Sequence, residues 1–293
     1  MTMKNKGSFK SLGKESIVTE STAGIKIYLE STDDQYILRN WFSTFNFYDK
    51  LSFDSVSETR GNGGCQLVRK KVEESESTAF GIVDRDVLLA DPDFQDSLWW
   101  EIDDEVFSSS KPYGEKIFVL HRWELENYLL HPQALASLMA DKRLDATTSP
   151  TDIAKLLCDH EENMVAVTLL STISTKTGIV LAGGTRHLKD KNGAELKAEI
   201  QKQLSVPQIS IEAEQIKINR FAENEKDSIQ RWHRLSRLLD GKRIMHRIDD
   251  LLFSGKVKLE SERGVLAGYI AKHKLIDPAL TDWLEGVYSS AVS

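Results

Sequence analysis

The sequence predicts an α/β protein, with a mostly parallel sheet flanked by helices and then a mainly α-helical second half. From about residue 24 to 140, short β-branched and aromatic runs alternate with segments of helical period. Beyond residue 147, strand-like runs become rare. We therefore divide the chain into a flexible N-terminal arm (1–23), an α/β domain (24–146) and a mainly helical C-terminal domain (147–293).

Four stretches have the residue types of strands. They are residues 25–29, 51–56, 79–83 and 116–120. The third, AFGIV, is apolar throughout, which is typical of a strand buried on both faces of a sheet. The first and third runs stop abruptly at acidic residues, so their carboxyl ends are easy to place.

Helical spacing fills the gaps between these strands. Residues 33–45 predict a first helix, with Thr32 or Asp33 as its N-cap. In the segment 65–75, Leu67, Val68 and Val72 suit the inward face of a second helix. Residues 121–141 are amphipathic, and Pro132 predicts a break in that helix.

Composition excludes several classes of protein. Hydrophobic residues make up 40% and charged residues 28% of the 293, as in ordinary globular chains, so a disordered or fibrous protein is excluded. No apolar run approaches the ~20 residues of a membrane helix, and the polar, lysine-dotted N-terminus lacks the apolar core of a signal peptide. We expect a cytoplasmic protein without a membrane partner. The two cysteines are too far apart for a zinc ribbon, and we expect both to be packing residues.

Charge is unevenly distributed along the chain. Residues 72–105 hold twelve carboxylates against one arginine, whereas residues 217–247 hold nine lysines and arginines against four acids. Within the basic segment, Arg231, Arg234 and Arg237 recur every third residue, on a face separate from the apolar one. Three interpretations are open for them: contact with nucleic-acid phosphates, a solvated helix face, or docking of a protein partner. The acidic segment is the rival candidate for their anionic neighbour.

Acidic residues gather at the predicted strand ends, where open parallel sheets bind ligands. Glu30 follows the first strand, and Asp84 and Asp86 follow the third. The two aspartates, two apart on an extended chain, should point to one side and approach one hard cation. Each acid alone is more often a cap or loop residue, but their convergence favours Mg²⁺ or Mn²⁺. Glu126 is either a further ligand or a first-turn helix carboxylate.

Nucleotide hydrolysis is not expected of this chain. It contains no GxxxxGK[ST] motif, and the RGNGG run at residues 60–64 follows only a weak strand, so we interpret it as a turn. If ATP controls the protein, a partner must handle it.

Three segments carry a family resemblance in their order: IYLESTDD at 27–34, GIVDRD at 81–86 and VLHRWELENYLL at 119–130. Together they resemble a TOPRIM domain, the metal-binding fold of topoisomerases, primases and some nucleases. The downstream ENYLL is similar to the DUF4435 branch, which includes the effectors that accompany an ABC-type ATPase in PARIS anti-phage defence. One departure is visible, since Ser31 stands where TOPRIM domains commonly have glycine after the glutamate.

The resemblance implies site residues and a function. Glu30 would be the TOPRIM glutamate, Asp84 and Asp86 the DxD pair, and Glu126 an additional metal ligand. It further implies a Mg²⁺- or Mn²⁺-dependent nuclease that acts as a toxic effector, an RNA substrate with tRNA as the expected target, an active homodimer, and restraint by the ATPase until triggered. The competing hypothesis is a noncatalytic TOPRIM-fold binding or regulatory subunit of an ATPase complex.

Neighbouring residues have simpler expected roles. We interpret Arg85 as a structural salt-bridge partner, and Asp33 and Asp34 as cap and first-turn residues. Neither a catalytic tyrosine domain for strand passage nor a zinc module for primase activity is suggested by the sequence.

Overall fold

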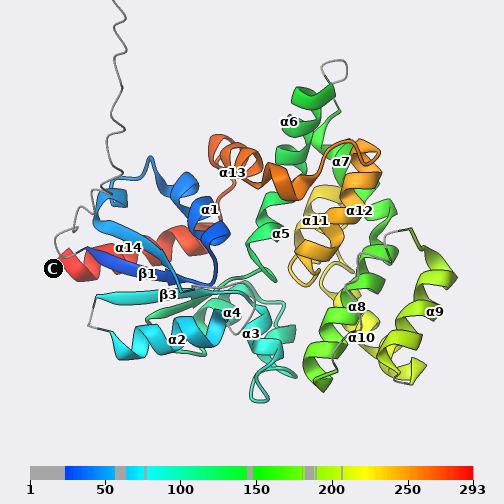
Figure 1. Cartoon of the computed structure of the whole chain (residues 1–293), viewed down its shortest axis with the longest axis horizontal. Coiled ribbons are helices and arrows are strands. Elements are labelled where there is room, and N and C mark those ends of the chain that lie inside the picture. Colours follow the sequence, from blue (N-terminus) through cyan, green and yellow to red (C-terminus); the bar gives the residue numbers. More distant parts are fainter. Residues whose placement is uncertain are drawn as a thin grey trace, which may run out of the picture.

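A computed structural model describes residues 24–56, 64–75, 78–143, 148–179, 181, 188, 190–205 and 207–292. The predicted arm at residues 1–23 lies outside this part of the chain. In Figure 1, the sheet and the helices that flank it form the left part of the molecule, and a group of helices that includes α7 to α12 forms the right part. No helix in the described residues is long and apolar enough to cross a bilayer.

The sheet has four parallel strands in the order β2-β1-β3-β4. Their bounds are Ile25–Leu29 (β1), Leu51–Ser55 (β2), Ala79–Val83 (β3) and Ile117–Val119 (β4). In the register, Ile27 pairs with Phe53 on one side and Phe80 on the other. The predicted parallel α/β arrangement is confirmed, and β1 and β3 have the predicted bounds. Because all four strands run the same way, their carboxyl ends meet at one edge.

Helices connect and cover these strands. The first half contains α1 (Thr32–Phe42), α2 (Gly64–Glu74), α3 (Asp86–Leu89), α4 (Asp104–Ser110), α5 (Leu125–Leu129) and α6 (Pro132–Arg143). The second half contains α7 (Pro150–Asp159), α8 (Glu161–Thr177), α9 (Gly193–Leu204), α10 (Gln208–Arg220), α11 (Ser228–Leu235), α12 (Gly241–Phe253), α13 (Arg263–Lys272) and α14 (Pro278–Val292). The helical character predicted for the second half is confirmed.

The sheet is covered on both faces, with α2 below it and α1 and α14 above it in Figure 1. Gly81 of β3 permits the close approach of α2, because a Cβ there would lie 2.5 Å from Val68 Cγ1. On the other face, the Trp283 ring of α14 packs against Phe80 and Phe118. A helix from the end of the chain thus completes the sheet's core, while the boundary at residue 146/147 stays a prediction.

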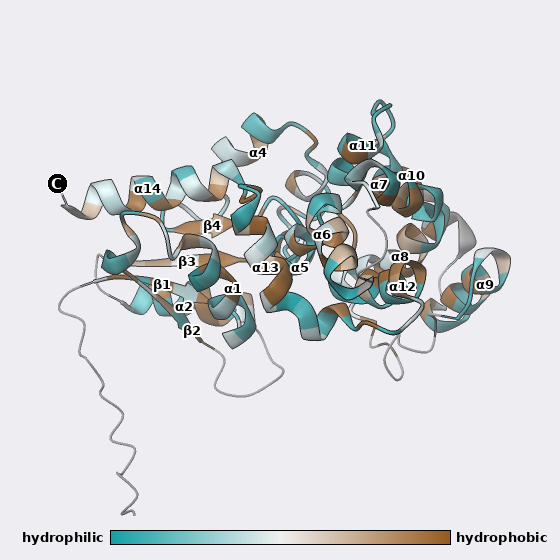
Figure 2. Ribbon diagram, turned by 90° about the horizontal axis from the view of Figure 1, so that it is seen from above, coloured by the Kyte–Doolittle hydropathy of each residue, from teal (hydrophilic) through white to brown (hydrophobic). Residues whose placement is uncertain are grey.

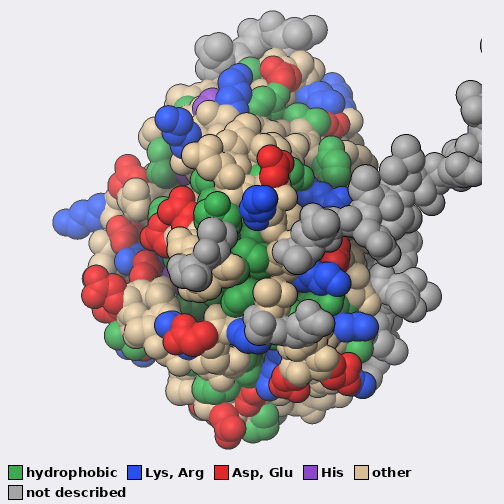
Figure 3. All heavy atoms as spheres, turned by 90° about the vertical axis from the view of Figure 1, so that its left-hand side faces the viewer, with side chains coloured by type: hydrophobic (Ala, Val, Ile, Leu, Met, Phe, Trp, Pro, Cys, Tyr) green, Lys and Arg blue, Asp and Glu red, His purple; other side chains and the backbone are tan. Residues whose placement is uncertain are grey.

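Hydrophobic packing continues into the helical half, where α8 buries ten consecutive residues, Met164 to Ile173. Figure 2 shows β3 and β4 as hydrophobic segments and several outer helices with both hydrophilic and hydrophobic residues, in keeping with buried strands and surface helices. On the face shown in Figure 3, acidic, basic and hydrophobic side chains are interspersed.

Three local expectations are corrected. The N-cap of α1 is Ser31, which forms a capping box with Asp34, whereas Thr32 is already helical. Leu67 of α2 is 40% exposed, since only Val68 and Val72 face the sheet. The helix predicted over 121–141 begins only at Leu125. The break predicted near Pro132 is confirmed, since α5 ends at Leu129 and α6 begins at Pro132.

Candidate functional site

The carboxylates of Glu30, Asp84 and Asp86 come together where β1 and β3 end. Glu30 is the first residue after β1, Asp84 the first after β3, and Asp86 begins α3. Glu30 Oε1 accepts a hydrogen bond from the backbone amide of Asp84 at 3.0 Å. Since β1 and β3 are neighbours in the sheet, this bond ties the two strand ends together and holds the three acids in one region.

Asp84 and Asp86 do not lie on an extended chain, so the predicted reason for their convergence, alternation along a strand, is wrong. The extended chain ends at Val83, and Arg85 has helical backbone angles, so the chain turns between the two aspartates. Arg85 is 1% exposed and donates to the carbonyls of His121, Trp99 and Glu101. Among the described residues it has no carboxylate within ion-pair distance, so its expected role as a salt-bridge partner is also wrong. Its hydrogen bonds to these backbone carbonyls instead stabilise the turn after β3.

Burial and mutual repulsion make these acids harder to ionise. Burial, followed by the Glu30 charge, raises the pKa of Asp84 well above its ordinary value. The same two causes raise the pKa of Asp86 to about 7. The ammonium of Lys242 opposes both shifts. Carboxylates whose ionisation is disfavoured in this way gain from a nearby cation.

The start of α2 forms the wall beside Glu30. A Cβ on Gly64 would lie 2.5 Å from Glu30 Oε2, so only glycine fits without displacing the carboxylate. Cys65 Sγ donates to Glu30 Oε1 and lies 4.0 Å from Asp86 Oδ1. Sequence reasoning treated Cys65 as a packing residue and Gly64 as part of a turn. With Arg69 and part of α3, these residues line a cavity of about 540 Å³ that opens beside the acids.

Asp34 joins the same electrostatic group. It is 9% exposed, and its side chain accepts from the Ser31 amide at 3.0 Å. Burial and then the charge of Glu126 raise its pKa to about 7. Its capping role, expected from the sequence, therefore coexists with a place beside the candidate site.

Two further acids, Glu124 and Glu126, are paired with cations from the helical half. Glu124 Oε2 lies 2.8 Å from Lys242 Nζ, and Glu124 Oε1 accepts from the Lys242 backbone amide at the start of α12. Glu126 Oε1 lies 2.8 Å from Arg263 Nη2 and 3.7 Å from Lys242 Nζ. Glu126 Oε2 is buried and has no hydrogen-bond partner in the described part of the chain.

Lys242 was missed by sequence reasoning, although its ammonium lies within ion-pair distance of both Glu124 and Glu126. It lies 118 residues beyond Glu124, within a basic segment that gave no reason to single it out. Gly241 before it offers a signal in retrospect. A Cβ there would lie 2.7 Å from Asn127 Oδ1 and 3.0 Å from Glu124 Oε1, so glycine lets α12 start against these side chains.

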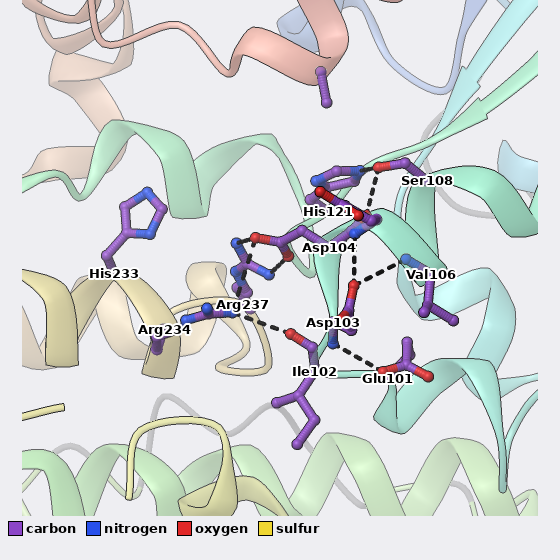
Figure 4. A network of polar contacts seen from close by, with 12 residues as sticks. Glu101, Ile102, Asp103, Asp104, Val106, Ser108, His121, His233, Arg234 and Arg237 are labelled. Atoms are coloured by element: carbon purple, nitrogen blue, oxygen red, sulfur yellow. Dashed lines mark hydrogen bonds and ion pairs between the residues drawn. The ribbon is translucent and has the colours of Figure 1, made fainter. Parts of the chain in front are cut away.

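The three arginines of the basic segment do not share one helix face, because α11 ends at Leu235 and Arg237 follows it. Arg231 forms an ion pair with Glu161. Arg237 binds both oxygens of Asp104, and Arg234 donates to the Ile102 carbonyl, as Figure 4 shows. Asp104 and Ile102 belong to the acidic segment 72–105. This segment, considered above as the alternative to nucleic-acid phosphates, is therefore a partner of Arg234 and Arg237. Glu161, the partner of Arg231, lies outside it. Contact of the three arginines with phosphates stays an untested prediction.

The donor set can be compared with what a metal requires. Glu30, Asp84 and Asp86 supply only carboxylate oxygens, which suit Mg²⁺ or Mn²⁺. In the described residues, no three His, Cys, Asp or Glu side chains surround one point as a ready ligand set. The acids thus fit a hard dication by donor type and charge, while Glu126 has its own cationic partners.

Comparisons with known proteins give no further guide. No protein-family model, curated protein or solved structure matches the chain.

Proposed function

We propose that this chain is a metal-dependent nuclease with a TOPRIM-like catalytic domain. The observation that carries the proposal is the set of carboxylates at the ends of β1 and β3, in which burial and the Glu30 charge oppose the ionisation of Asp84 and Asp86. Such a set at the carboxyl edge of a parallel sheet suits cation-assisted chemistry on a phosphodiester.

The residues divide the work in this proposal. Glu30, Asp84 and Asp86 would hold Mg²⁺ or Mn²⁺, which supplies charge neutralisation on the phosphate and activation of water. The Asp84 amide fixes the Glu30 carboxylate, and the close fit of Gly64 limits its movement. The Lys242 ammonium adds positive potential next to the acids, where a substrate phosphate would need it.

Substrate and partners follow from the family resemblance. We propose RNA, with tRNA as the target, an active homodimer, and an ABC-type ATPase that restrains the effector in anti-phage defence.

Cleavage of tRNA and of DNA by the purified chain, with Mg²⁺ or Mn²⁺, alone and with the ATPase, tests the proposal. The matched variants are Glu30→Gln and Glu73→Gln, since Glu73 is exposed on α2. We expect cleavage to disappear in Glu30→Gln and to persist in Glu73→Gln. Equal cleavage by wild type and a folded Glu30→Gln protein would overturn the assignment.

A second function has support from the ion pairs. Lys242 and Arg263 already neutralise Glu124 and Glu126 and join the sheet to the helical half, as a noncatalytic binding or regulatory subunit would allow. Calorimetric titration with Mn²⁺ separates the two functions. The nuclease requires binding that Glu30→Gln abolishes, whereas the noncatalytic subunit requires none.

A further inference from the structure

Two adjoining cavities lie apart from the candidate metal site, between α4, the segment after β4 and the start of α14. Their volumes are about 310 and 400 Å³. Ser108, His121 and Ala279 belong to the walls of both, so the two cavities adjoin, and together they are called the groove here. Ser108 Oγ and His121 Nε2 lie 3.1 Å apart in this shared wall. Glu30, Asp84, Asp86 and Glu126 line neither cavity.

The two ends of the groove differ in chemistry. The smaller cavity is lined by the rings of Phe107, Phe118 and Trp283, and the Trp283 ring centre lies 5.4 Å from that of Phe118. The larger cavity is lined by Arg122 and Arg237, together with His233 and Tyr128. A ligand that fills the groove would therefore meet aromatic rings at one end and guanidinium groups at the other.

Arg122 is buried without a close carboxylate. It is 5% exposed, its Nη1 donates to the Asn127 carbonyl and to Ser236 Oγ, and its guanidinium carbon lies 4.8 Å from the centre of the Tyr128 ring. Within the described residues, no carboxylate forms an ion pair with it. Its hydrogen-bond and ring partners are thus neutral groups. A guanidinium buried without a counter-anion is costly, and an anion in the larger cavity would remove that cost.

The acids around the larger cavity are engaged or peripheral. Asp104 gives both oxygens to Arg237, as Figure 4 shows. Asp277 accepts from the Tyr128 hydroxyl at 3.1 Å and from the Ala279 amide at 2.9 Å, and lies 4.0 Å from His121 Nδ1. Glu105 is exposed.

The potential at the arginine end is correspondingly positive. The Arg122 charge, followed by burial and the Arg237 charge, lowers the pKa of His233 to about 2. His233 therefore stays neutral at physiological pH and offers a hydrogen bond without adding repulsion.

We propose that this groove binds a nucleoside monophosphate, with its phosphate on Arg122 and its base against Phe118 and Trp283. Arginine suits phosphate because its planar fork donates two parallel hydrogen bonds, and an aromatic surface accepts any base by stacking. The site is independent of the nuclease assignment, since none of its residues belongs to the carboxylate group.

Calorimetric titration of the full chain at constant ionic strength tests the ligand class. We expect AMP to bind at least about tenfold more tightly than adenosine or inorganic phosphate, because each of these fills one end only. Equal binding of AMP and phosphate, or no binding of AMP at millimolar concentration, would overturn the proposal. A short oligonucleotide with a 5′-phosphate distinguishes the source: tighter binding than AMP assigns the groove to a strand end, and weaker binding to the free nucleotide.

A matched pair of exposed serines on α4 tests the location. Ser108 lines both cavities, whereas Ser109 lines neither. Ser108→Glu places a carboxylate in the groove and should weaken AMP binding at least about tenfold, while Ser109→Glu adds the same charge outside it and should change binding less than about twofold. Equal effects of the two variants, with both proteins folded by circular dichroism, would contradict the groove as the site.

Discussion

The acids after β1 and β3 and the acids after β4 have the same chemistry but different electrostatic surroundings. Glu30 lies close to Asp84 and Asp86, and burial followed by the Glu30 charge raises the pKa of both aspartates. Glu124 and Glu126 form direct ion pairs with Lys242 and Arg263. The ion pairs of Glu124 and Glu126 with Lys242 and Arg263 are called the clamp below. A carboxylate after a parallel strand is thus either a candidate metal ligand or part of the clamp, depending on whether a cation from a distant helix pairs with it.

The clamp joins the two halves of the chain, so its loss should affect stability differently from the loss of Asp84 or Asp86. Lys242 is the second residue of α12, and Arg263 begins α13 and also lies 2.8 Å from Asp33 of α1. Removing a clamp residue should loosen the protein, whereas neutralising a strand-end acid should relieve repulsion. Four experiments test this difference between the two groups of acids.

The largest effect is expected from Arg263→Met. The change leaves the Glu126 carboxylate, whose side chain is 3% exposed, without its close cation, and should lower the free energy of unfolding by about 3 kcal/mol. Urea denaturation measures it. Arg39→Met is the control, because the exposed Arg39 donates only to the Phe53 carbonyl and should cost below about 1 kcal/mol. A similar small loss for both variants would mean that the clamp contributes little.

A divalent cation should act at the other group of acids. Mn²⁺ at a hundred times its dissociation constant should raise the free energy of unfolding of the wild type by about 2.7 kcal/mol. The double variant Asp84→Asn, Asp86→Asn should show no such gain, since the amides do not attract the cation. Thermal unfolding with and without Mn²⁺ gives the comparison, and equal stabilisation of both proteins would place the cation elsewhere.

Without divalent ions, the same double variant should be more stable than the wild type. Burial and the Glu30 charge raise the pKa of both aspartates, so their ionised forms are disfavoured in the folded protein at pH 8. We expect a gain on the order of 1–3 kcal/mol in urea denaturation. Glu126→Gln, which weakens the clamp, should change stability in the opposite direction. If the double variant and Glu126→Gln both lower the free energy of unfolding, repulsion is not what distinguishes the acids after β3 from those of the clamp.

The smallest expected effect is on the pH profile of stability. The pKa of Asp86 rises to about 7 on folding, so between about pH 4 and 7 the folded protein holds a proton that the unfolded chain releases. Stability contributed by this proton is present below pH 4 and is lost as the pH rises through 7. Asp86→Asn should flatten the fall across this window relative to the wild type, because the variant has no proton to release there. Parallel profiles for the two proteins would contradict the raised pKa.

Local sequence patterns were sufficient for the strands and for the strand-end acids. β1 and β3 consist of apolar, β-branched runs that end at an acid, and parallel pairing then places Glu30 and Asp84 at one edge. The cap of α1 was misplaced by one residue because Ser31, Thr32 and Asp33 are all good caps. Only the backbone angles, extended at Ser31, identify the cap that forms the box.

Contacts between residues far apart could not be predicted in the same way. Cys65 lies against Glu30 because α2 packs closely on the sheet at Gly81, and Lys242 reaches Glu124 because Gly241 lets α12 begin there. Opposite charge in the segments 72–105 and 217–247 indicated an attraction. It did not identify Asp104 as the residue that Arg237 would bind.

By itself, the sequence determined the α/β class, the parallel strands and the acids that follow them, because periodicity and residue type act over a few neighbouring positions. The tertiary structure decided which acids are neutralised and where Arg122 lies without an anion. These outcomes depend on distances of a few ångströms between segments more than a hundred residues apart. Coulomb energy and desolvation vary steeply over such distances, so charge pairing at a buried site is settled only when the helices pack.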